Sequence, residues 1–209
     1  MTKPPSFPAF INESHVGDTN TSSATTLSHN SGVGGTRMIV DVYIRRGLTV
    51  ASVSTITFGA TSLSVVITTA ISDTNRWERW EAVVAESTTD TVTVTYTGSA
   101  SNACVAVRTY RDVGSLGTSA SNAAASGAGS LQASVDGTNA LVVDMYGAAT
   151  NPTLTPDGGQ AEEFTQFQDG AGQCKLGGSR KTGSGTTTMG WANSNGTVPH
   201  GILVTPLVA

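Results

Sequence analysis

The residues that could carry acid–base or nucleophilic chemistry are few and scattered. His15, His29 and His200 lie far apart in the sequence. A catalytic triad needs a histidine beside a nucleophile and an orienting carboxylate, and no segment supplies that pattern. Neither a His-Glu-x-x-His motif nor paired cysteines occur, so no zinc spacing is present. These features predict a protein that is not an enzyme and has no metal site or cofactor.

Carboxylates give no clearer site. A glycosidase on a β-scaffold uses two carboxylates that face one another across a groove. The candidate pairs are Glu78 with Glu81 and Glu162 with Glu163, and both differ in strand parity. Calcium prefers several oxygen ligands from loops, and Asp18, Asp73, Asp90 and Asp157 fall in expected loops. No EF-hand pattern accompanies them, so calcium binding by a loop stays an open alternative.

The most unusual segment is residues 75–84, Asn-Arg-Trp-Glu-Arg-Trp-Glu-Ala-Val-Val. In a strand, Trp77, Arg79 and Glu81 share one face, and Trp80 lies on the other. Two charges are hard to bury, so we expect Trp80 in the core and Trp77 exposed. An exposed Trp77 beside Arg79 could stack on a sugar or bind a protein partner. The alternative is an arginine stem that simply covers an aromatic ring on a sheet surface.

These residues must be positioned by β-strands. Residues 91–98, Thr-Val-Thr-Val-Thr-Tyr-Thr-Gly, alternate polar and apolar side chains and then stop at glycine. The chain has 32 threonines and 23 serines, and threonine suits exposed strand positions. Strands are expected at residues 21–28, 37–46, 53–58, 62–69, 77–85, 91–97, 103–111, 131–135, 140–146, 163–168, 172–176, 186–191 and 201–205. The pattern predicts an all-β protein, an antiparallel β-sandwich of jelly-roll-like or Ig-like type.

Two features suggest how the chain is divided. Residues 1–17 contain Pro4, Pro5 and Pro8, so we expect an extended N-terminal arm. Its apolar side chains, Phe7, Phe10 and Ile11, favour docking on the body or on a partner, with a disordered terminus as the alternative. Residues 18–209 form the β-domain. A weak repeat, residues 35–43 against 137–146 with one inserted residue, indicates related halves at about 18–113 and 118–209. They would complete one sandwich or form two small ones.

Charge and cysteine content narrow the class of protein. A net charge of −4 gives no electrostatic footprint for nucleic acid. No window approaches the roughly 20 apolar residues of a membrane span, and the N-terminus lacks a signal core. We therefore expect a protein that is made in a cytoplasm and is not exported by the usual route. Cys104 and Cys174 are 70 residues apart, and either two reduced thiols or one disulfide between the halves fits.

The order of several motifs resembles a known group of domains. The motifs are Val-Ser-Thr-Ile-Thr-Phe-Gly-Ala at 53–60, Trp-x-x-Trp-x-x-Val-Val at 77–84, Thr-Val-Thr-Val-Thr-Tyr at 91–96, Val-Ala-Val-Arg-Thr-Tyr at 105–110, Trp-Ala-Asn-Ser at 191–194 and Gly-Ile-Leu-Val-Thr-Pro at 201–206. Together they resemble β-sandwich domains in virion proteins of tailed bacteriophages and in some bacterial surface proteins, over about residues 20–207. The resemblance carries no catalytic residue.

The resemblance implies a structural role. Such modules decorate capsids or form tail fibres and tips. The missing export signal favours a phage particle assembled in the host cytoplasm over a bacterial surface. We expect a capsid decoration or cement protein on the outer surface of the virion. It would bind the major capsid protein, another virion protein or a second copy of itself through Phe7, Phe10, Ile11, Trp77 and Arg79. The alternative is a tail or fibre module that binds a surface glycan or receptor.

Overall fold

A computed structural model gives the fold of the chain. It describes residues 7–19, 23–45, 51–71, 74–98, 100, 102–126 and 130–209. Within these ranges the secondary structure is entirely β, in 18 strands, and every strand pair is antiparallel. The described residues hold no helix long and apolar enough to cross a membrane. The expectation of an all-β, antiparallel protein is confirmed.

The N-terminal half, residues 9–111, forms two sheets. Sheet A has the strand order β1 (Ala9–Thr19), β9 (Asn102–Arg111), β3 (Arg37–Arg45), β7 (Asn75–Val83) and β6 (Ser64–Ile71). Sheet B has the order β2 (Ala24–Asn30), β8 (Thr89–Tyr96), β4 (Val53–Phe58) and β5 (Thr61–Ser62). Alternation places one set of strand residues, among them Val92, Val94 and Tyr96, in an apolar core between the two sheets.

The C-terminal half, residues 115–208, repeats this plan. Sheet C has the order β10 (Ser115–Leu116), β18 (His200–Val208), β13 (Ala140–Ala149), β16 (Cys174–Thr182) and β15 (Ala161–Gln168), and β11 (Ala120–Ala124) also pairs with β18. Sheet D has the order β12 (Ser130–Asp136), β17 (Thr186–Asn193) and β14 (Leu154–Pro156). The core between sheets C and D includes Leu131, Met189 and Trp191.

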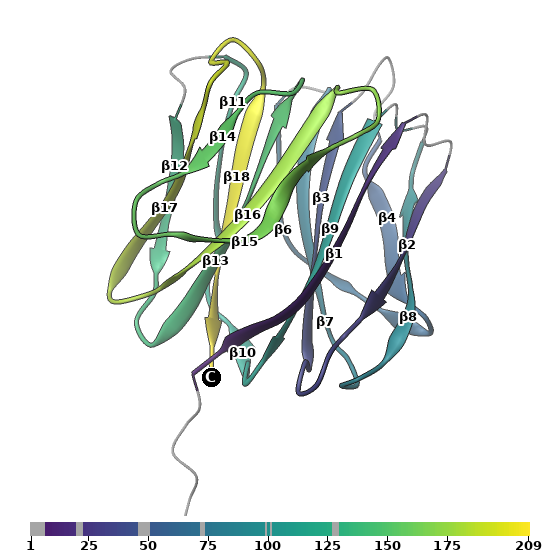
Figure 1. Cartoon of the computed structure of the whole chain (residues 1–209), viewed down its shortest axis with the longest axis vertical. Coiled ribbons are helices and arrows are strands. Elements are labelled where there is room, and N and C mark those ends of the chain that lie inside the picture. Colours follow the sequence, from purple (N-terminus) through teal and green to yellow (C-terminus); the bar gives the residue numbers. More distant parts are fainter. Residues whose placement is uncertain are drawn as a thin grey trace, which may run out of the picture.

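The four sheets stack in the order B, A, C, D (Figure 1). Sheets A and C face one another and bury two more apolar clusters between them. Their central strands β3 and β13 are consequently covered on both faces, and almost every residue of each is buried. A sheet buried on both faces reads as a continuous apolar run rather than as an alternation.

The facing strands of sheets A and C follow a two-fold arrangement. Strand β3 lies against β13, β9 against β16 and β7 against β18, while β1 lies near β15 and β6 near β11. By pairing, β9 corresponds to β18 and β7 to β16, so each contact has its reciprocal. This is the packing expected when two copies of one unit meet about a two-fold axis.

The segments of the sequence repeat, residues 35–43 and 137–146, include parts of the corresponding strands β3 and β13. Asp41 of β3 and Asp144 of β13 are aligned by the repeat, but Asp41 faces sheet C whereas Asp144 faces sheet D. The inserted residue accounts for this difference, because a slip of one position moves a strand side chain to the opposite face.

The N-terminal segment differs from the expected arm. Residues 9–19 form β1, the edge strand of sheet A, in register with β9 from Ala9 opposite Arg111 to Thr19 opposite Asn102. The expected boundary at residue 17 therefore falls inside a strand, and this part of the segment docks on the chain's own body. An edge strand tolerates a preceding proline such as Pro8, because one side of it makes no ladder. Residues 1–6 lie outside the described residues.

Candidate functional site: a charged network between the halves

The densest polar cluster lies between sheets A and C. Asp41 on β3, Arg79 on β7 and Arg108 on β9 occupy neighbouring strands of sheet A, and all three are fully buried. Val40 and Val42, the neighbours of Asp41 along β3, point to the opposite face of sheet A and join the core against sheet B. Strand alternation thus presents the charges to sheet C while the same strands keep an apolar face behind them.

Asp41 is the centre of this cluster. Its Oδ1 accepts from Arg79 Nε at 2.6 Å and its Oδ2 accepts from Arg79 Nη2 at 3.1 Å, a two-pronged pair. Arg108 Nη2 also donates to Asp41 Oδ2. Arg79 Nη1 reaches across the interface to the carbonyl of Val143 on β13, at 3.1 Å. Asp41 therefore holds two guanidinium groups, one of which is anchored to the other half.

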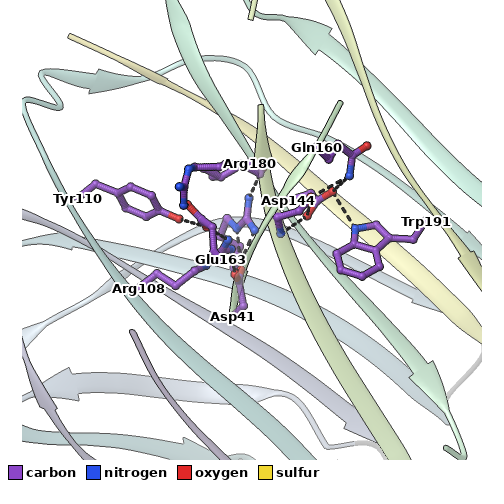
Figure 2. Close-up of polar contacts among 11 residues, drawn as sticks. Asp41, Arg108, Tyr110, Asp144, Gln160, Glu163, Arg180 and Trp191 are labelled. Atoms are coloured by element: carbon purple, nitrogen blue, oxygen red, sulfur yellow. Dashed lines mark hydrogen bonds and ion pairs between the residues drawn. The ribbon is translucent and has the colours of Figure 1, made fainter. Parts of the chain in front are cut away.

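Glu163, on β15 of sheet C, provides the second carboxylate of this cluster (Figure 2). Its Oε2 accepts from Arg108 Nη1 at 2.5 Å and from the Tyr110 hydroxyl at 2.6 Å. Burial raises the pKa of Tyr110 well above its usual value, so the phenol stays protonated and donates. Arg180, at the rim, places Nη1 3.6 Å from Glu163 Oε1.

A β-bulge sets the direction of Glu163. The β15–β16 register shifts between Glu162 and Phe164, so Glu163 is the extra residue. Both consecutive side chains then contact Arg108, since Glu163 pairs with it and the guanidinium lies 5.7 Å from the centroid of the Phe164 ring. Bulges re-aim side chains in this way. The network balances two carboxylates with two fully buried guanidiniums, which is the condition for keeping charges out of water.

Asp144 forms a separate polar centre inside the C-terminal half (Figure 2). It accepts hydrogen bonds from Ser179 N at 2.7 Å, Ser179 Oγ at 3.0 Å, Trp191 Nε1 at 2.9 Å and Gln160 Nε2 at 3.2 Å. Burial raises the pKa of Asp144 to about 7, although the donors from Trp191 and Ser179 act in the opposite direction. The carboxylate ties β13 to β16 and to β17 of sheet D.

The exposure predicted for Trp77 is wrong. Trp77 and Arg79 are 0% exposed, and both face sheet C. Trp77 stacks on Tyr43 with ring centroids 4.8 Å apart, and its indole N–H donates to the carbonyl of Gly147 at 3.1 Å. Trp80 is only half-buried and packs against the periphery of the core between sheets A and B, so its predicted place inside the core is met only in part. Asp41 of β3 and the carbonyl of Val143 on β13 pair with Arg79, which explains why the charge beside Trp77 did not force exposure.

The predicted contact residues of the N-terminal segment are separated. Phe7 is 44% exposed. Phe10 is partly buried, with its ring 5.9 Å from that of Tyr110 and 5.4 Å from the Arg180 guanidinium. Ile11 is partly buried beside the turn at Gly32. Phe10 and Ile11 thus pack mainly against other residues of the same chain. Phe7 is the most exposed of the three residues.

The histidines are also apart. His29 is buried between Ser14 Oγ at 3.0 Å and Thr109 Oγ1 at 2.7 Å, and burial lowers its pKa to about 4. His15 stacks on Phe167 at 4.3 Å, and His200 lies 6.0 Å from the Tyr146 ring. Within the described ranges no group of three His, Cys, Asp or Glu side chains is placed to hold a metal ion. Asp73, one of the loop aspartates considered for calcium, lies outside the described residues.

Sequence reasoning missed Asp41 and Arg108, and it considered Glu163 only as a partner of Glu162 in a carboxylate pair. A signal was present for the two missed residues, because Asp41 and Arg108 each interrupt a run of apolar strand residues. A charge inside such a run indicates a buried ion pair, but the partner cannot be chosen without the packing. Searches against protein-family models and among curated proteins find no match to this chain.

Proposed function

We propose that the chain is a non-enzymatic structural protein of a tailed-phage particle, a capsid decoration or cement protein that binds neighbouring capsomers. The observation that carries the proposal is the strand order of both halves. Strands β1-β9-β3-β7 face β2-β8-β4-β5, and β11-β18-β13-β16 face β12-β17-β14. We infer that each half is a jelly-roll sandwich, an architecture of capsid and lectin domains. The link to a virion is an analogy of fold.

The distribution of polar groups supports a scaffold. The buried charges pair with one another, and the outward faces of sheets B and D present short hydroxyl side chains, including Thr55, Thr91 and Ser134. A single contact made by such short side chains is weak. On a capsid lattice many identical contacts add together, because each additional one forms at high effective concentration.

Counting copies in purified particles tests the proposal. We expect mass spectrometry of gradient-purified virions to find the protein in hundreds of copies, with the major capsid protein as its cross-linking partner. Purified protein should also rebind particles that lack it and raise their resistance to heat. Absence from purified particles, or a copy number of a few per particle, would overturn the decoration role.

Two matched variants locate the binding face. Thr55→Arg on sheet B and Ser134→Arg on sheet D each place a large cation on one outer face without touching a core. We expect both variants to fold, and one of them to lose particle binding. If both bind particles as the unaltered protein does, the outer faces are not the contact.

A glycan- or receptor-binding tail module is the second candidate, favoured by one observation. Trp80 on β7 is half-buried, and its indole N–H and the guanidinium of Arg76, whose side chain is 32% exposed, both bind the carboxylate of Glu78. Aromatic rings beside planar polar groups suit sugar stacking. Isothermal titration with host surface glycans, comparing Trp80→Ala with the exposed-residue control Val83→Ala, separates this candidate from the first. Glycan binding that only Trp80→Ala abolishes would favour the tail module.

A further inference from the structure

Two cysteines from different halves meet at the interface between sheets A and C. Cys104 lies on β9 and Cys174 begins β16, strands that face one another. Their sulfurs are 3.0 Å apart, and both residues are 0% exposed. A disulfide bond is about 2.05 Å long, so closing the gap requires a movement of only about 1 Å.

The surroundings enclose the two sulfurs. Cys104 is paired in register with Tyr43 of β3 and with Gly17 of β1. A Cβ on Gly17 would lie 2.4 Å from the carbonyl oxygen of Gln168, so the backbone just after β15 passes directly over this part of β1. On the other side, the backbone N–H groups of residues 173 and 174 donate to Asp169 Oδ1 at 2.7 and 3.4 Å. Both cysteines are therefore held in place by backbone on each side.

We propose that Cys104 and Cys174 form an intramolecular disulfide that covalently joins the two halves under oxidising conditions. The oxidant is a low-molecular-weight disulfide. One cysteine thiolate attacks it, forming a mixed disulfide and releasing one small thiol. The second cysteine then attacks the protein sulfur of that mixed disulfide and releases the second small thiol. The protein loses two protons and two electrons, and one S–S bond is exchanged for another.

Burial determines when the reaction proceeds. A hydrogen bond with Cys104 and burial together raise the pKa of the Cys174 thiol, so Cys174 is a poor nucleophile while the halves are docked. An external disulfide can then reach the pair only before the halves dock or during their transient separation. Once formed, the bond is shielded from reductants by the same burial. The proposal does not rest on the function proposed above.

The test uses the full chain in two arms. In one, native protein is incubated with oxidised glutathione, and in the other, urea-unfolded protein refolds in a mixture of oxidised and reduced glutathione. Free thiols are alkylated after denaturation, and peptide mapping identifies the linked residues. We expect complete closure of a Cys104–Cys174 bond in the refolding arm and much slower closure in the native arm.

The thermal stability of the oxidised protein shows whether the disulfide stabilises the docked halves. Cross-linking residues 70 positions apart should raise the Tm by about 5–15 °C relative to the reduced protein. The Cys104→Ala/Cys174→Ala variant should show no such difference between oxidised and reduced conditions. Two alkylatable thiols after oxidative refolding, disulfides only between chains, or an oxidised form with an unchanged or lower Tm would each overturn the proposal.

Discussion

The contact of Trp77 with two glycines of sheet C supports a quantitative prediction about how the halves dock. A Cβ on Gly147 would lie 2.4 Å from Trp77 Nε1, and one on Gly201 would lie 2.7 Å from Trp77 Cδ2. The indole therefore occupies space that any larger residue at these two positions would fill. We predict that Trp77→Ala and Gly147→Ala each destabilise the protein and that their effects are strongly coupled.

The magnitudes follow from burial and fit. Trp77 is fully buried and its N–H satisfies the Gly147 carbonyl, so Trp77→Ala should cost about 3–5 kcal/mol. Gly147→Ala overpacks the interface and should cost about 1–3 kcal/mol. In the Trp77→Ala background the two closest contacts of the new methyl are gone and the Tyr43 ring, with Cγ at 3.0 Å, is its nearest remaining neighbour. Gly147→Ala should then cost less than about 1 kcal/mol. The expected coupling is on the order of 1–2 kcal/mol.

Urea denaturation followed by far-UV circular dichroism gives the free energy of unfolding of the four proteins in this cycle. Gly158→Ala is the matched control, because a Cβ there meets no atom within 4 Å, and its effect should stay within about 0.5 kcal/mol. If Gly147→Ala costs as much without Trp77 as with it, the indole does not define the fit between the halves, and the argument fails.

Three further predictions concern other parts of the structure. Asp41→Asn leaves two buried guanidiniums short of a counter-charge and should cost about 3–5 kcal/mol by urea denaturation, while the partly exposed control Asp112→Asn should cost almost nothing. The pKa of His29 in the folded protein, about 4, lies below its ordinary 6.5. Stability should therefore fall as pH drops from 6.5 towards 4, by up to about 3 kcal/mol from this group. His29→Gln should remove that part of the pH dependence, and an unchanged pH profile in this variant would contradict the assignment. Phe10→Ala should lower the free energy of unfolding by about 1–2 kcal/mol, because Phe10 packs on the body, and Phe7→Ala by less than about 0.5 kcal/mol.

Strand positions were predictable because they depend on local patterns. The alternation at residues 91–97 corresponds to β8, and residues 53–58 correspond to β4 without a shift. In a strand with one buried and one exposed face, successive side chains alternate between core and solvent, so the sequence alternates between apolar and polar residues. The short strands β10 and β14 were not predicted as strands. Each has few residues, so its pairing depends on the neighbouring strand rather than on its own pattern.

The sequence alone determined the all-β class and most of the strands. The burial of both faces of β7 around residues 77–80 was decided only by the tertiary structure. Sheet A is buried on both sides, so both parities of residues 77–80 point into protein, and the alternation rule no longer distinguishes core from solvent. Arg79 is buried because its partner Asp41 comes from β3, and Arg108 because Glu163 comes from a bulge in the other half. Contacts between residues so far apart in the sequence leave no local periodicity. Burial of these charges is stable only where the folded chain brings their partners together.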